Sequence, residues 1–166
     1  MNLPIALVIY AAAMTLANLS VAAFGPSVTV LNAFVLIGLD LALRDWLHVR
    51  LKVWQMGALI AFTGALTFVL NPAAGKIAVA SAVAFTAAAL VDWVTFLRLK
   101  GSWLRRANGS NVAGAAVDSL LFPTIAFGAL MPQIVLGQFV AKVAGGALWA
   151  WLLSKLAKYG LTAPKR

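Results

Sequence analysis

The sequence predicts an all-α integral membrane protein: a single bundle of six transmembrane helices with both termini in the cytoplasm. Of its 166 residues, 63% are hydrophobic and only 10% are charged, and the mean hydropathy is +0.97. A soluble domain is usually about 45–50% apolar and about 25% charged. A core of this length could not hide so much apolar surface from water. The composition therefore excludes a soluble globular protein, and the outer surface is expected to face lipid.

Each membrane-crossing helix needs about 20 mostly apolar residues. Residues 1–39 carry no charge but are too many for one helix, and Gly25-Pro26-Ser27 is the natural break between two spans. Asn71-Pro72 and Met131-Pro132 are two further turn signals. The expected spans are residues 3–23, 28–47, 53–70, 75–97, 111–130 and 133–156. The first segment lacks the basic start of a signal peptide, so we expect it to remain as a helix.

The positions of the cations set the expected orientation. Eleven of the 13 lysines and arginines fall in three clusters, at Arg44–Lys52, Arg98–Arg106 and Lys155–Arg166. In a six-span arrangement all three clusters lie on one side, and loops retained in the cytoplasm are enriched in Lys and Arg. The net charge of +9 is thus interpreted as a topology signal, and nucleic acid is not expected as a partner.

Several charged side chains fall inside the predicted spans. Asp40, Asp92 and Asp118 lie in spans two, four and five, and Lys142 lies near the middle of span six. A charge at bilayer depth is unfavourable unless it is paired or hydrated, so it usually marks a pathway or a binding site. Arg44 lies four residues after Asp40 and can pair with it on one helix face. We therefore expect one shared polar centre between the helices.

Helical spacing adds neighbours to this centre. Asn111 and Phe122 share a stripe with Asp118, and Gln138 shares one with Lys142, which is followed by two glycines that allow close helix approach. Asn18 and Asn32 are further polar groups at depth, and Trp93 beside Asp92 is a candidate for stacking on a ligand. The predicted substrate-binding residues are Asn18, Asp40, Arg44, Asp92, Trp93, Asn111, Asp118, Phe122, Gln138 and Lys142. Purely structural ion pairs at Asp40–Arg44 and Asp118–Lys142 are the alternative interpretation.

Catalytic and metal chemistry have little support in the composition. The chain has no cysteine, no glutamate and a single histidine, which removes disulfides, thiolate sites and almost every catalytic metal site. Gly75-Lys76 lacks the glycine and the hydroxyl residue of a phosphate-binding loop. We expect no catalytic residues, no metal and no cofactor, and the chain is not expected to be an enzyme.

The same residues carry a resemblance to a known family. Ile37–His48, with Asp40 and Arg44, resembles the aspartate-to-arginine motif of the queuosine precursor transporters, also called the vitamin uptake transporter (VUT) family. Residues 111–127 are similar to that family's asparagine-to-aspartate segment, which runs into a phenylalanine-rich helix. Asn18, Asp92 and Lys142 also fall where the family has such residues, and the short loops and termini fit a short branch.

The resemblance implies a six-helix importer in the bacterial inner membrane for 7-deazaguanine bases such as preQ0 and preQ1, intermediates on the way to queuosine in transfer RNA. A carboxylate can accept two hydrogen bonds from the ring N–H and exocyclic amine of such a purine-like base. One alternative is the substrate-binding subunit of an ATP-driven energy-coupling vitamin importer, with Ala13 and Ala17 in a docking surface of small residues. Another is a membrane enzyme or a structural membrane subunit, and a homodimer is an open arrangement in each case.

Overall fold

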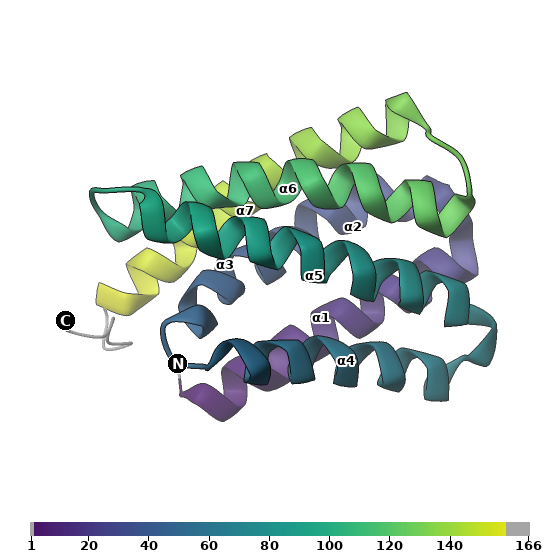
Figure 1. Cartoon of the computed structure of the whole chain (residues 1–166), viewed down its shortest axis with the longest axis horizontal. Coiled ribbons are helices and arrows are strands. Elements are labelled where there is room, and N and C mark those ends of the chain that lie inside the picture. Colours follow the sequence, from purple (N-terminus) through teal and green to yellow (C-terminus); the bar gives the residue numbers. More distant parts are fainter. Residues whose placement is uncertain (1, 159–166) are drawn as a thin grey trace.

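The structure is a computed structural model that describes residues 2–158, apart from the side chains of residues 45, 48 and 156–158. Within these residues all regular secondary structure is helical (Figure 1). The elements are α1 (Leu3–Phe24), η1 (Gly25–Val28), α2 (Thr29–Asn32), η2 (Ala33–Ile37), α3 (Gly38–His48), α4 (Val53–Leu70), η3 (Pro72–Ala74), α5 (Gly75–Arg98), α6 (Trp103–Phe127) and α7 (Pro132–Lys158). The prediction of an all-α protein is confirmed for the described part of the chain.

Five helical stretches are long and apolar enough to cross a membrane. Four of them are the stretches around α4, α5, α6 and α7, and the first is the 42-residue stretch Leu3–Arg44. A straight helix of that length would measure about 63 Å, twice the thickness of a bilayer core. The chain instead turns back at η1, where Gly25 has a φ of +66°, so that α1 packs against η2 and α3.

The helices run back and forth between two ends of the molecule (Figure 1). The α3–α4 and α5–α6 connections lie at the same end as the start of α1 and the end of α7. The turn at η1, the turn at η3 and the α6–α7 connection lie at the opposite end. We call the first the basic end, because Arg50, Lys52 and the cations of residues 98–106 lie there. Lys165 and Arg166 lie outside the described residues.

Most of the expected spans coincide closely with helices of the structure, but the helix that contains the fifth expected span begins earlier than that span. Helix α4 covers Val53–Leu70 as predicted, whereas α6 begins at Trp103 and not at residue 111. Ser102 caps it, with its side-chain oxygen accepting a hydrogen bond from the Arg105 backbone N–H at 3.3 Å. The expected span rests on apolar residues alone. Residues 103–110 have low hydropathy, and polar residues outside lipid can still be helical, so hydropathy does not predict this first part of the helix. Arg44, which we grouped with the loop cations, is fully buried inside the bundle.

The closest approach of two helices brings α7 against the start of α3. A Cβ added at Gly38 would lie 2.6 Å from the carbonyl carbon of Gly145, so only glycine fits at this contact. The neighbouring segment η2 is a π-helix, a form that is frequent at functional sites. Trp149 of α7 donates a hydrogen bond from its indole Nε1 to the backbone oxygen of Val35 in η2 at 3.0 Å. These contacts fix α7 beside the irregular part of the second helical segment.

The outer surface is apolar, as the composition predicts. Large hydrophobic side chains such as Val69 and Leu136 are 75% and 64% exposed. Buried positions are occupied by many alanines, which lets the helices pack closely. A set of polar and charged side chains is buried inside the bundle, and most of these residues form the candidate site.

Candidate functional site

A buried ion pair joins α6 to α7. Lys142 Nζ lies 2.7 Å from Asp118 Oδ2, and the two side chains are only 2% and 4% exposed. The same ammonium group donates hydrogen bonds to Gln138 Oε1 at 2.8 Å and to Ser119 Oγ at 3.3 Å. Gln138 lies one helical turn before Lys142, so both point to the same side of α7. All three protons of the lysine therefore have oxygen partners within the bundle.

A second buried ion pair lies within α3. Arg44 pairs with Asp40 four residues before it, and neither side chain is exposed. The guanidinium carbon lies 5.5 Å from the centre of the Phe85 ring, within range of a cation–π interaction. Tyr10 of α1 is fully buried beside this pair and interacts with both charged groups.

The two ion pairs belong to one electrostatic cluster. The Arg44 charge interacts with Asp92 and Asp118 as well as with Asp40. Asp92 is fully buried and lies where a Cβ on Gly114 would contact it at 3.2 Å. Asn111 is also buried, with its amide nitrogen next to Gly146 of α7. The expected polar centre therefore exists as a cluster of buried charges, although its role in binding stays a prediction.

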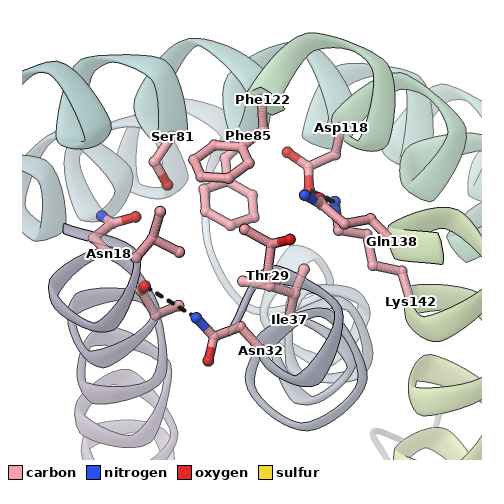
Figure 2. Close-up of a pocket in the computed structure, with 12 residues that line it drawn as sticks. Asn18, Thr29, Asn32, Ile37, Ser81, Phe85, Asp118, Phe122, Gln138 and Lys142 are labelled. Carbon is pink, nitrogen blue, oxygen red and sulfur yellow. Dashed lines mark hydrogen bonds and ion pairs between the residues drawn. The ribbon is translucent and has the colours of Figure 1, made fainter. Parts of the chain in front are cut away.

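A narrow cavity opens beside the Asp118–Lys142 pair (Figure 2). Its walls come from α1, the α2–η2 segment, α5, α6 and α7. Its volume of about 20 Å³ is room for about one water molecule. The lining residues are Ala17, Asn18, Val21, Thr29, Asn32, Ile37, Ser81, Phe85, Asp118, Phe122, Gln138 and Lys142. Figure 2 shows the rings of Phe85 and Phe122 between Asn18 and Ser81 on one side and Asp118 and Lys142 on the other.

Five of the ten predicted binding residues line this cavity: Asn18, Asp118, Phe122, Gln138 and Lys142. Four others, Asp40, Arg44, Asp92 and Asn111, are buried in the bundle but do not line it. Trp93 is placed elsewhere, in the wall of a separate cavity of about 240 Å³ between α4 and α5. Successive side chains on a helix point about 100° apart, so the inward direction of Asp92 turns Trp93 towards α4. The predicted stacking role of Trp93 therefore finds no support in this arrangement.

Sequence reasoning left out several members of the site. Ser81 and Phe85 of α5 line the cavity, and Tyr10 contacts the Asp40–Arg44 pair. Tyr10 and Ser81 are isolated polar residues in apolar helices, which is a signal that could have found them. Phe85 carries no such signal, because it is one of nine phenylalanines in an apolar chain.

Several buried polar atoms of the cluster have no hydrogen-bond partner among the described residues. Beside the cavity these are Asp118 Oδ1, an acceptor, and Gln138 Nε2, a donor. Three residues of the other ion pair and its surroundings also have atoms without such a partner: Arg44 at Nε and Nη1, Asp40 at Oδ1, and Asn111 at both amide atoms. Leaving a buried polar group unsatisfied typically costs about 1–3 kcal/mol, so native proteins rarely do so without reason. These atoms are available to donate to, and accept from, a polar molecule that enters the bundle.

One of three comparisons with known proteins gives this chain a family. Residues 4–155 match the family described as "Putative vitamin uptake transporter". No curated protein and no solved structure matches the chain. The family match covers nearly the whole described bundle, including both ion pairs and the cavity between them. With its apolar surface and buried polar cluster, this chain belongs to the vitamin uptake transporter family of membrane proteins.

Proposed function

We propose that this protein imports queuosine precursors, 7-deazaguanine bases such as preQ0 and preQ1, across the bacterial inner membrane. The family match supports a transporter of a small molecule. One observation carries the choice of a polar planar cargo: Asp118 Oδ1 and Gln138 Nε2 are buried beside a cavity with no hydrogen-bond partner among the described residues. The resemblance of residues 37–48 and 111–127 to queuosine precursor transporters supports the substrate class.

The proposed topology has six spans with both termini in the cytoplasm. The turn at η1 separates the 22 residues of α1 from the helical segment that runs from Thr29 to His48, and each of these is one span of the proposed topology. Arg50, Lys52 and the cations of residues 98–106 lie at the basic end. Positively charged loops stay in the cytoplasm, so this end faces inward in the proposal.

Recognition would use the groups beside the cavity. Asp118 would accept hydrogen bonds from the ring N–H and exocyclic amine of the base, and the amide of Gln138 would donate to its carbonyl oxygen. Phe122 would pack against the face of the flat ring. A cavity of about 20 Å³ is far smaller than the about 300–1,000 Å³ of most ligand pockets. Binding therefore requires the helices around it to separate, as expected for a carrier that alternates between states.

The test is uptake of a labelled 7-deazaguanine base in cells that lack their own importer, with queuosine in transfer RNA as a second readout. The parent protein should raise both above the empty vector, and Gln138→Leu should lose most of the gain because a donor at the cavity is gone. Gln133→Leu is the matched control, since Gln133 is exposed near the start of the same helix and does not line the cavity. A parent protein that reaches the membrane but gives no gain over the empty vector would reject this substrate class.

The energy-coupling alternative loses the docking surface of small residues that supported it. Ala13 and Ala17 are only 4% and 5% exposed, so they face the inside of the bundle and not a partner protein. Uptake by this chain without any ATP-hydrolysing module would separate the two functions. Uptake that requires such a module would favour the alternative.

A further inference from the structure

The buried polar residues form two compartments along the axis of the bundle. The cavity takes its lining from the later part of α1, the early part of α5 and the start of α7, on the side away from the basic end. A second group, Tyr10, Asp40, Arg44 and Asn111, lies nearer the basic end and lines no part of the cavity. We call this second group the inner layer. Its members come from α1, α3 and α6, and all of them are at most 1% exposed.

Phe85 lies between the two compartments. Its ring lines the cavity, and it also lies 5.5 Å from the guanidinium carbon of Arg44 in the inner layer. The side chain is 3% exposed, and Ile37 completes the wall beside it. An aromatic ring held by a cation–π contact is a stable wall that a change of one side-chain torsion can move.

The inner layer carries unused hydrogen-bonding capacity of both kinds. Arg44 Nε and Nη1 are donors, Asp40 Oδ1 is an acceptor, and the Asn111 amide offers both, and none has a partner among the described residues. A layer whose only task was to hold the helices together would be expected to satisfy these groups internally. Unpaired donors and acceptors of both kinds suit a heterocycle that has an amide-like edge, which offers a donor beside an acceptor.

We propose that Phe85 is a gate and that the inner layer is a second binding site for the same cargo, occupied after the ring moves. This inference rests on the proposed function for the identity of the cargo. The molecule first meets Asp118, Gln138 and Lys142 in the cavity. It then passes Phe85 and exchanges these partners for Arg44, Asp40 and Asn111 on the way to the basic end.

Thiol labelling tests the gate without any substrate, because the chain contains no cysteine. Single variants Ser81→Cys, in the cavity, and Asn111→Cys, in the inner layer, are reconstituted and treated from the side opposite the basic end with a charged, membrane-impermeant thiol reagent. When the helices around the cavity separate on that side, Ser81→Cys should react, and Asn111→Cys should react at least tenfold more slowly. Adding Phe85→Ala should raise the rate at Asn111→Cys by tenfold or more and leave the rate at Ser81→Cys within about twofold.

Phe122→Ala is the matched control, because Phe122 lines the same cavity without contacting Arg44 in the described structure. It should leave the rate at Asn111→Cys unchanged. If Phe85→Ala does not fold, Phe85→Leu keeps an apolar side chain there and should give a smaller increase in the same direction. Equal rates at Asn111→Cys with and without Phe85, or the same increase from Phe122→Ala, would overturn the gate.

Binding and uptake complete the test of the second site. Phe85→Trp enlarges the wall, so the purified protein should still bind the labelled base while uptake falls by tenfold or more. Loss of binding and uptake together in Phe85→Trp would contradict a gate that lies beyond the first site. If the parent protein itself neither binds nor imports the base, the proposed substrate fails, whereas the labelling result still decides whether Phe85 separates two compartments.

Discussion

The Asp118–Lys142 pair offers a decisive comparison between a binding role and a structural one. At 2.7 Å and an effective dielectric constant of about 20, the attraction between the two charges is about 6 kcal/mol. Removing one partner leaves a buried charge alone, which typically costs about 3–5 kcal/mol. Replacing both partners by neutral groups of similar size is often close to neutral. Asp118→Asn and Lys142→Gln should therefore each be strongly destabilising, and the double variant should recover most of the lost stability.

The measurement is the free energy of unfolding of the four proteins in mixed micelles, together with uptake of labelled base by the same four in cells. The single variants should unfold about 3–5 kcal/mol more easily. The sum of the two single effects should differ from the effect of the double variant by much more than the about 0.3–0.5 kcal/mol that is typical of independent sites. Uptake should stay low in the double variant, because an amide at position 118 has a donor NH2 in place of the second acceptor oxygen and cannot form the bidentate pair with two N–H groups.

Two results would refute this reasoning. Additive effects within about 0.5 kcal/mol would mean that the two charges are not coupled in the folded protein. A double variant that regains both stability and uptake would mean that the pair only holds α6 against α7. That second result is what the structural-subunit interpretation expects.

Two further predictions concern the contact between α7 and the second helical segment. Gly145→Ala should lower the free energy of unfolding by about 1–3 kcal/mol, because the new Cβ would overlap the backbone of Phe34. Gly57→Ala, where a Cβ meets nothing within 4 Å, should instead be neutral or gain up to about 1 kcal/mol in the same unfolding assay. Trp149→Phe removes the hydrogen bond to Val35, and should lower stability by about 0.5–1.5 kcal/mol in thermal or denaturant unfolding. If Gly145→Ala or Trp149→Phe leaves the free energy of unfolding unchanged, the contact between α7 and the second helical segment does not contribute to stability.

The helices could be predicted from sequence because lipid imposes a simple rule. Every spanning segment must be long, apolar and internally hydrogen-bonded, and so Val53–Leu70 was predicted to the residue. The same rule gave no information about Trp103–Ser110, which is helical but polar. The π-helix at η2 was also missed, because it reflects the contact with Gly145 and Trp149 and not the local sequence.

The polar cluster was predictable for the same physical reason. A charge such as Asp118 or Lys142 within an apolar segment must find a partner inside the protein, and both do. Which residues border the cavity was less predictable, because that depends on helix rotation and on crossing angles between segments far apart in sequence. Asp92 and Trp93 are neighbours in the chain, yet they face different parts of the bundle.

The small cavity and the paired charges follow from one requirement on a carrier of polar molecules. Water cannot fill a site in the lipid interior at little cost, so the charges must be neutralised even when no cargo is bound. Asp118 and Lys142 neutralise each other's charge, and the lysine also donates hydrogen bonds to Gln138 and Ser119. A cargo that donates to Asp118 Oδ1 and accepts from Gln138 Nε2 would use two atoms that have no partner among the described residues, and it would leave the ion pair in place. The gain on binding is then limited to these few contacts, which keeps the bound and empty states close enough in energy for the cargo to be released.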